Sequence, residues 1–269
     1  TQPVVLNATQ TLADHLAFTR YDGSKADSVE MPTLGAENGL ALVSMIGADY
    51  DDPQWDTLLD QLTFNEMVNT ITLGFHNTAA VESIGKTRTK DENGPQGLTA
   101  ALTGGASAMC YTSEDVMAAT FNVDLINDVG RCIGEDCLAM GYSGLYGPGI
   151  NMHRTAYSGR NFEYYASDPF VAGTICAAEV NGIQSKGVYV YLKHVALNDS
   201  ESSRRGVNTW LNEQAAREIY LEVADKAITD GGAWSVMTGF NRWGAYWCGA
   251  YDNLLTGFLR GELGMRGMI

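Results

Sequence analysis

The sequence predicts an α/β protein built as a TIM-like (β/α)8 barrel, and three observations favour that fold. Strand-like apolar runs and helical periods alternate at about 30–40 residues per unit, which is typical of a parallel sheet with crossover helices. Polar clusters follow three of the expected strands, as they do at the mouth of a barrel, where the carboxyl ends of the strands meet. No G-x-G-x-x-G follows a strand, so a dinucleotide-binding sheet is disfavoured.

The N-terminal part of the chain carries the weakest structural signals. Its apolar runs are short and separated by polar, glycine-containing stretches, so residues 1–52 are interpreted as a lead-in or connector segment. Asp51-Asp52-Pro53 marks a boundary, because this combination is typical of a turn. Residues 53–269 therefore form the expected barrel domain.

Local signals define the helices and strands of that domain. Thr63 and Glu66 have the spacing of a capping box, so we expect a helix that starts near residue 64. Asp168 and Pro169 match the N-cap and first residue of another helix. The other expected bounds are, in chain order, a strand at Ala106–Tyr111, a helix within about 113–140, an extended segment at Leu145–Ile150, the end of the Asp168 helix near Ser185, a strand at Val188–Leu192, a helix at Glu213–Ile228, a strand at Trp234–Thr238, a helix at Asp252–Glu262 and a further strand that opens at Met265–Ile269.

Composition excludes several classes of partner. The chain of 269 residues has 17 Lys and Arg against 32 Asp and Glu, a net charge of −15, and no basic run. Nucleic acids and anionic membranes are therefore not expected partners, because both require a basic surface. No window approaches the roughly 18 consecutive apolar residues of a membrane span, so none is expected.

The cysteines carry no sign of a disulfide framework or a metal site. All five are scattered without ligand spacing, and we interpret them as buried small hydrophobic residues. The first residues lack a signal-peptide pattern, which slightly favours the cytoplasm. A chain that begins at Thr1 is also compatible with a processed, secreted protein, so the compartment stays open.

A loop from Gly147 to Gly173 concentrates side chains suited to a binding site. It holds arginines, a carboxylate, asparagines and several aromatic residues between glycines and prolines. Such a mixture is unsuited to a core, so the loop is interpreted as forming a site. A buried arginine oriented by a carboxylate binds vicinal hydroxyls well, which favours Arg160 with Glu163 as its orienting partner. Arg154 is assigned a structural role.

Two further polar clusters follow the next expected strand. Lys193 and His194 end the apolar run VYVYLKH, and they are interpreted either as an exposed strand-edge pair or as donors to substrate hydroxyls. Asn198, Glu201 and Arg204 come shortly afterwards. These three are as well suited to bracing the loop as to touching a ligand.

The absence of metal-binding, nucleophile and phosphate-binding motifs narrows the class of substrate. No second histidine lies at ligand spacing from His194, so a zinc site is rejected. Neither a G-x-S-x-G motif nor a phosphate-binding loop occurs, which argues against a nucleophilic triad and a nucleotide. The polar segment Asp91–Gly97 is either a plain surface turn or a hydroxyl-binding loop. The remaining Lys, His, Arg and carboxylate groups predict a hydroxyl-rich, uncharged ligand, namely a carbohydrate.

Four stretches of the chain resemble blocks of a known family, in matching order and spacing. They are GPGINMHRTAYSGRNFEYYASDP, YLKHVALNDSESSRRGVNTWLNEQAAREIYL, SVMTGFNRWG and NLLTGFLRGELGMRGMI. From about residue 54 to 269 the chain resembles glycoside hydrolase family 3, the β-glucosidase-like enzymes. The resemblance implies an exo-acting, retaining β-glycosidase without a cofactor. In that mechanism an Asp forms a glycosyl-enzyme and a second carboxyl assists the leaving group.

The resemblance also assigns roles to particular residues. By position, Arg160, Lys193 and His194 correspond to the family's residues that hold the sugar in the cleavage subsite. Met237 and Phe240 correspond to residues that line this subsite. Phe240 stands where many members carry Tyr, which removes a hydroxyl next to the nucleophile.

The loop at Asn93 departs from the family pattern. Asn93 stands where the family usually has an Asp that grips distal sugar hydroxyls, so an amide replaces a charged acceptor. This weakens the case for ordinary glucoside binding. Asp91 and Glu92 are the carboxylates available to compensate.

The resemblance further implies that the chain stops short of its nucleophile. An Asp is expected just after Ile269, and the acid/base residue is expected in a different domain. We therefore expect a barrel that is incomplete at its C-terminal end and inactive alone. Its expected partner is the remainder of the same protein, including an α/β sandwich domain. Exposed strand edges also predict self-association into a homo-oligomer.

Alternatives remain open at this point. A non-catalytic sugar-binding relative would carry Asn93 and lack the nucleophile naturally. A β-xylosidase-like or N-acetylglucosaminidase-like member is another alternative, although VALNDSESSR lacks the histidine of the latter branch. The last is an unrelated barrel enzyme with Arg154 and Arg160 as a clamp for an anionic substrate.

Overall fold

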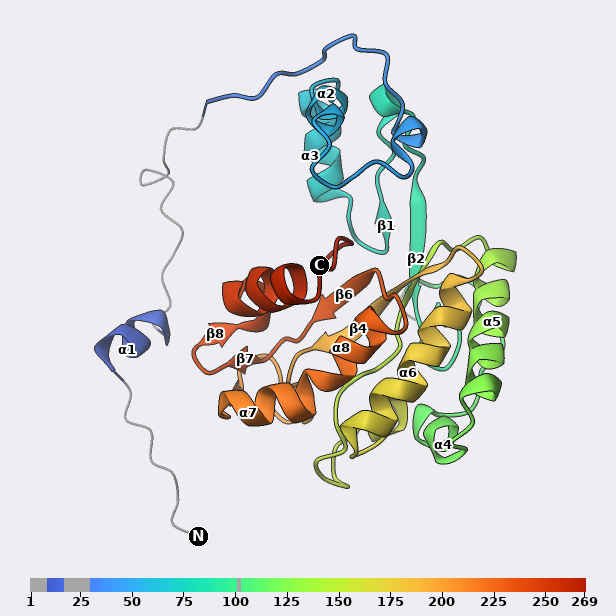
Figure 1. Cartoon of the computed structure of the whole chain (residues 1–269), viewed down its shortest axis with the longest axis vertical. Helices are drawn as coiled ribbons and strands as arrows, with labels where there is room; N and C mark the ends of the chain where they lie inside the picture. Colours follow the sequence, from blue (N-terminus) through green and yellow to red (C-terminus); the bar gives the residue numbers. More distant parts are fainter. Residues whose placement is uncertain (1–8, 17–29, 101–102) are drawn as a thin grey trace.

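The main sheet has the strand order of an opened barrel. The computed structural model describes residues 9–16, 30–100 and 103–269 (Figure 1). Its five-stranded sheet has the order β1-β2-β3-β4-β6, with β2, β3, β4 and β6 parallel and β1 antiparallel to β2. These strands are β1 (Asn77–Thr78), β2 (Thr89–Asn93), β3 (Gly144–Tyr146), β4 (Tyr189–Val195) and β6 (Ser235–Thr238). Parallel strands that are neighbours in chain order are typical of a barrel, because a doubly wound sheet reverses its order. The predicted α/β barrel-type fold is thus confirmed, as a curled half-barrel.

Three helices lie side by side against one face of this sheet (Figure 1). They are α5 (Val123–Ala139), α6 (Pro169–Gln184) and α8 (Glu222–Thr229). The predicted start of α6 is confirmed, since the Asp168 side chain accepts a hydrogen bond from the backbone nitrogen of Val171 at 2.8 Å. Within the described ranges, no helix combines the length and apolar character needed to cross a membrane.

Short elements complete the fold. The remaining helices are α1 (Gln10–Leu16), α2 (Gln54–Leu59), α3 (Phe64–Thr72), α4 (Glu114–Ala119) and α7 (Glu213–Ala215), with the π-helices η5 (Ala216–Tyr220) and η7 (Asn253–Glu262) and the 3-10 helices η2 (Leu42–Met45), η3 (Glu82–Ile84), η4 (Asn161–Glu163) and η6 (Cys248–Ala250). A second sheet has the order β5-β7-β8, formed by Asn208–Thr209, Arg242–Trp243 and Tyr246–Trp247.

The region before β2 has its own apolar cluster. The predicted capping box of α3 is confirmed, because the Thr63 backbone nitrogen donates to Glu66 Oε2 at 2.9 Å and Thr63 Oγ1 accepts from the Glu66 backbone nitrogen at 3.3 Å. Met45 packs with the cluster formed by Leu58, Leu62, Val81 and Ile84. Part of the predicted lead-in therefore packs against the segment that follows it, while the domain boundary at residue 52 stays a prediction.

The strand predicted at Ala106–Tyr111 is wrong. This segment is irregular, and its backbone nitrogens at Ala108 and Tyr111 donate to Leu98 and Gln96 at 3.0 and 2.8 Å. The barrel strand in this part of the chain is β2 instead, with the sequence TKDEN. Its inward face lines a polar barrel interior, so an apolar run was the wrong signal for it.

Two other predicted elements need correction. The helix within about 113–140 is interrupted between α4 and α5, where Phe121 has a φ of 50°. The strand at Met265–Ile269 is absent, although the Val236 nitrogen donates to the Met268 oxygen at 3.1 Å. Arg260 Nη1 instead donates to the carbonyl oxygens of Met265 and Gly267, at 2.9 and 2.6 Å, and this occupies acceptors that a strand ladder needs.

The cysteine interpretation holds in part. Cys137, Cys176 and Cys248 are buried, as predicted, and none of the five forms a disulfide. Cys110 and Cys132 are exposed, which contradicts the prediction for these two. Cys110 follows the irregular segment that replaces the expected strand, so the burial that a strand would give it is missing.

The packing of α5 on α6 predicts the effect of one small substitution. A Cβ atom at Gly130 of α5 would lie 2.3 Å from the carbonyl oxygen of Glu179 on α6. We expect Gly130→Ala to lower the free energy of unfolding by about 1–3 kcal/mol, because the helices must separate. Gly257→Ala is the matched control, since a Cβ there meets nothing within 4 Å and the change favours a helix. Equal urea midpoints for the two variants would contradict this packing.

Candidate functional site

A cavity of about 580 Å³ opens at the carboxyl ends of the parallel strands. The loop after β2 forms one wall, the long loop after β3 a second, and the ends of β4 and β6 the rest. Six residues predicted to bind substrate line it together: Asn93, Arg160, Lys193, His194, Met237 and Phe240. Residues more than 100 positions apart in the chain thus meet at one mouth, as expected for a barrel.

Glu163 lies at the centre of the polar contacts. Its carboxylate is hydrogen-bonded to Arg160 Nε through Oε1, and its Oε2 lies 3.4 Å from Lys193 Nζ. The side chains of Glu163 and Lys193 are only 6% and 4% exposed. Lys193 Nζ also donates to Asn93 Oδ1 at 2.9 Å, which joins the ends of β2 and β4.

Burial and neighbouring charges shift the pKa values of the cations. Burial lowers the pKa of Lys193, and the adjacent Glu163 only partly offsets this. Burial also acts to lower the pKa of Arg160, but the hydrogen bond to Glu163 raises it above its ordinary value. The pKa of His194 lies well below its usual range, because the ring is buried and near Arg160, Lys193 and Arg204. The imidazole is therefore neutral at pH 7.

Asn151 fixes the position of His194. Asn151 Oδ1 accepts from the His194 backbone nitrogen at 3.0 Å, and Asn151 Nδ2 donates to the His194 oxygen at 3.0 Å. The Tyr164 hydroxyl lies 3.4 Å from His194 Nδ1. His153 Nε2 lies 2.7 Å from the Tyr164 carbonyl oxygen, a contact within the loop itself.

Three of the residues predicted to support the site, Asn198, Glu201 and Arg204, are joined to one another and to Arg160. Glu201 lies 3.6 Å from Arg160 and 2.8 Å from Arg204, and accepts from Asn198 Nδ2 at 3.1 Å. Arg204 also lines the cavity, where its guanidinium sits 5.3 Å from the centroid of the Phe240 ring. Glu201 therefore ties the loop after β4 to Arg160.

Two predicted residues lie away from the cavity. Arg154 is exposed, 5.7 Å from the Tyr220 ring centroid, which is compatible with the structural role expected of it. Asp91 is buried and accepts from the hydroxyls of Tyr189 and Tyr191, at 2.5 and 3.0 Å. Asp91 and Asn93 share the inner face of β2, but two residues of strand separate them by about 7 Å. Asp91 thus belongs to the barrel interior below the cavity.

The sequence reasoning missed a buried pair of carboxyl groups behind the cavity wall. Glu114 and Glu179 are both 0% exposed. Glu114 accepts a hydrogen bond from Gln96, which lines the cavity, and Glu179 Oε2 accepts from the Tyr165 hydroxyl at 2.7 Å. The sequence does contain a signal for a buried carboxyl group, because Glu179 is the one charged residue in the otherwise uncharged helix PFVAGTICAAEVNGIQ.

Burial keeps this pair protonated to an unusually high pH. Burial raises the pKa of Glu179 to about 7, despite the hydrogen bond from Tyr165. Burial and the charge of Glu179 raise the pKa of Glu114 well above its ordinary value. The wall behind Gln96 is therefore sensitive to pH near neutrality.

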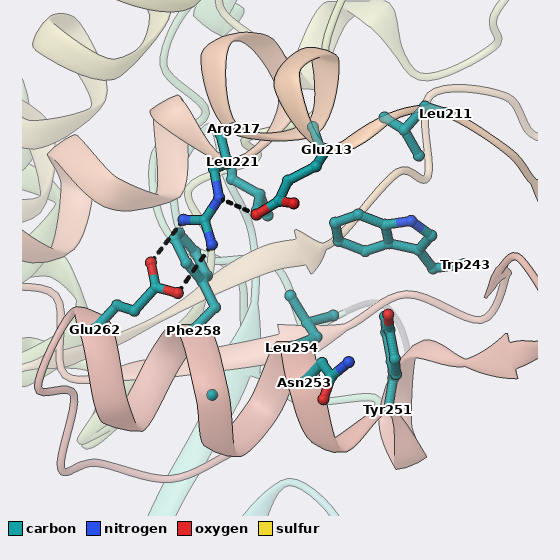
Figure 2. Close-up of a pocket in the computed structure, with 12 residues that line it drawn as sticks. Leu211, Glu213, Arg217, Leu221, Trp243, Tyr251, Asn253, Leu254, Phe258 and Glu262 are labelled. Carbon is teal, nitrogen blue, oxygen red and sulfur yellow. Dashed lines mark hydrogen bonds and ion pairs between the residues drawn. The ribbon is translucent and has the colours of Figure 1, made fainter.

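A second cavity, of about 490 Å³, lies between η5 and η7 (Figure 2). Its charged groups are satisfied by one another, since Arg217 is bonded to Glu262 at 2.6 and 2.9 Å and to Glu213 at 3.0 Å. Trp243 and Tyr251 flank an apolar floor. No residue predicted to bind substrate lines this cavity. Among the described residues, no cluster of three or more His, Cys, Asp or Glu side chains is arranged to hold a metal ion.

Comparisons with known proteins place the chain in one family. The family model for the Glycosyl hydrolase family 3 N terminal domain matches residues 68–269. A β-glucosidase of Rhizobium radiobacter is 33% identical over 217 residues, which are 80% of this chain and 26% of that protein. An exo-alpha-(1->6)-L-arabinopyranosidase of Bifidobacterium breve is 33% identical over 186 residues, 66% of this chain and 25% of that protein.

A solved structure also resembles the chain closely. β-Glucosidase 3B from Thermotoga neapolitana, in complex with α-D-glucose, superposes with a TM-score of 0.72 at 31% identity. The match covers 80% of this chain and 33% of that one. The chain thus spans about a quarter to a third of the proteins that it resembles.

The pairing at Glu163 predicts a large loss of stability on neutralisation. We expect Glu163→Gln to lower the free energy of unfolding by about 3–5 kcal/mol, because the buried Lys193 loses its counter-charge and Arg160 keeps only Glu201. Glu213→Gln removes the same charge from an exposed pair with Arg217 and should leave the urea midpoint unchanged. A midpoint for Glu163→Gln equal to that of the control would show that the buried Lys193 needs no charged partner.

The buried carboxyl pair predicts a pH dependence of stability. Glu179 has a raised pKa in the folded state, so the folded protein holds more protons than the unfolded chain between pH 4.5 and about 7. Stability should therefore fall as the pH rises through this window. Glu179→Gln should flatten the fall, which unfolding measured at several pH values tests. A variant that follows the same curve as the original protein would exclude Glu179 as its source.

Proposed function

The chain belongs to glycosyl hydrolase family 3, and we propose that its cavity is the sugar-binding part of a retaining, exo-acting β-glycosidase of the β-glucosidase type. The observation that carries the proposal is the convergence of Arg160, Lys193 and His194 in one cavity at the strand ends. Guanidinium, ammonium and imidazole groups bind vicinal hydroxyls, and Glu163 orients the first two. The names of the relatives, β-glucosidases among them, favour the same substrate class.

In this proposal the described residues beside the cavity hold the sugar, and none of them is a reacting carboxylate. The carboxylates beside the cavity, Glu163 and Glu201, are each engaged by cations, which leaves neither suited to attack an anomeric carbon. In the proposed mechanism the nucleophile is an Asp that follows Ile269, and a separate domain supplies the acid/base group. Neutral His194 and the cations position the ring for that attack.

Family membership excludes the alternative of an unrelated barrel enzyme. The anion clamp that this alternative required is also missing, because Arg154 is exposed and lies outside the cavity lining. The choice between β-glucosidase and other specificities depends on the cavity itself. The arabinopyranosidase among the relatives indicates that the family's scaffold accepts more than one sugar.

Binding to the 269-residue chain tests the proposal. D-Glucono-1,5-lactone should bind in titration calorimetry, and inorganic phosphate should not compete with it. Lys193→Gln should weaken binding by about tenfold or more, because it removes a charged donor from the cavity. Lys186→Gln is the control, since Lys186 pairs with Glu135 away from the cavity. Absence of lactone binding, or competition by phosphate, would contradict the proposal.

A further inference from the structure

Gln96 contributes a firmly held amide to the wall of the first cavity. The residue lines that cavity from the loop after β2, and its backbone oxygen accepts from the Tyr111 nitrogen at 2.8 Å. Its side-chain Nε2 donates to Oε2 of Glu114 and to the carbonyl oxygen of Phe162, the latter at 3.5 Å. Gln96 is therefore anchored both through its backbone and through its amide nitrogen.

The partners of the nitrogen decide which way the amide faces. A carbonyl oxygen only accepts, so a flipped amide would place Gln96 Oε1 against the Phe162 oxygen. Glu114 is 0% exposed, and its Oε1, which has no partner, is the oxygen that can carry a proton. Glu114 Oε2 thus accepts from Gln96 whether the carboxyl group is charged or neutral.

The oxygen of the Gln96 amide is left for a ligand. Among the described residues none donates to Gln96 Oε1, and the atom is not buried. The Asp that the proposed mechanism places after Ile269 does not fill this position, because an ionised carboxylate accepts and has no proton to donate. A sugar hydroxyl has such a proton.

Other neutral side chains of the lining can also accept, among them Ser107 and His194. Each of these can donate as well, since a hydroxyl rotates and a neutral imidazole carries one N–H group. Gln96 differs because its nitrogen is engaged behind the wall, so that only its acceptor remains for the cavity. It can therefore distinguish a group that donates a hydrogen bond from one that does not.

We propose that Gln96 selects the sugar by accepting a hydrogen bond from one of its hydroxyls, and that Glu114 is the positioning residue that turns the amide oxygen toward the cavity. The inference rests on the glycosidase function proposed above and adds a specificity-determining residue to it. A sugar with an ether or a fluorine in place of that hydroxyl is rejected, because the fixed acceptor then has no partner.

Calorimetry on the 269-residue chain tests the role of Gln96. Gln96→Met keeps the length of the side chain without the acceptor, and it should weaken the binding of D-glucono-1,5-lactone by about tenfold. Gln214→Met is the matched control, since Gln214 is exposed on α7 and donates to Glu218 outside the cavity lining. The control should bind the lactone as the original chain does.

Fluorinated sugars show whether a hydroxyl is the partner. The hydroxyls at C2, C3, C4 and C6 of methyl β-D-glucopyranoside are replaced one at a time by fluorine, which accepts weakly and cannot donate. One of these replacements should cost about tenfold less affinity in Gln96→Met than in the original chain, because the hydrogen bond is already lost. Equal costs in the two chains at every position would overturn the selection by Gln96.

Glu114 is tested through its effect on Gln96. Glu114→Gln keeps an oxygen that accepts from the Gln96 nitrogen, so it should retain the lactone affinity within about twofold, whereas Glu114→Leu should lower it about tenfold. Glu114→Leu combined with Gln96→Met should lose no more than Gln96→Met alone, since both act on one hydrogen bond. Additive losses would show that Glu114 acts on the site by another route and would overturn its positioning role.

The outcomes separate this inference from the proposed function. If the lactone binds Gln96→Met as tightly as the original chain, the inference is overturned and the proposed function stands. If neither the lactone nor the glucoside binds the original chain, both are overturned. If Glu114→Leu does not fold, Glu114→Gln decides the positioning role, because loss of affinity in a variant that keeps the acceptor would contradict it.

Discussion

The ion pairs of Glu163 are the interaction on which the rest of the site depends. Lys193 is 3% exposed, and a cation so deeply buried is tolerated only beside a counter-charge and hydrogen-bond acceptors. Glu163 supplies that charge from the loop after β3, while Lys193 belongs to β4 and bonds to Asn93 at the end of β2. One carboxylate thus fixes three segments relative to one another. Arg160 and Glu201 extend the network to the loop after β4.

The barrel separates this binding layer from a structural layer beneath it. Tyr189, Tyr191 and Asp91 fill the interior below the cavity, where the hydroxyls satisfy the buried carboxylate. Gly144 makes room for them, since a Cβ there would lie 2.3 Å from the Tyr189 ring and 2.6 Å from Asp91 Oδ1. The period of two along each strand places polar groups in both layers. Only those at the strand ends line the cavity.

The wall behind the cavity adds a different constraint. Gln96 lines the cavity and donates to Glu114, whose carboxyl neighbours Glu179 in the core. Protonation of these groups removes a charge repulsion in a region of low dielectric. The loop after β2, which carries Asn93 and Gln96, is therefore coupled both to Lys193 in front and to the carboxyl pair behind. This loop therefore contributes both to the lining of the cavity and to the stability of its wall.

The sequence by itself determined the features that depend on neighbouring residues. The capping box at Thr63, the N-cap at Asp168 and the strand predicted at Val188–Leu192 follow local rules of hydrogen bonding and periodicity. The structure contains all three, the strand as Tyr189–Val195. The resemblance of ordered motifs added the family, and with it the residues that line the cavity. These signals are local in the chain and need no knowledge of how segments pack.

Only the tertiary structure decided which polar residues reach the cavity. The sequence indicated a surface turn or a hydroxyl-binding loop at Asp91–Gly97, because these residues are polar, but Asp91–Asn93 pair with β3 as the end of β2. Asp91 and Asn93 look equivalent in sequence. In the structure, however, Asp91 accepts hydrogen bonds from two tyrosines of β4, whereas Asn93 accepts one from Lys193. Glu114 and Glu179 came together from separate helices. Strand pairing and burial join residues far apart in the chain, and no local pattern contains that information.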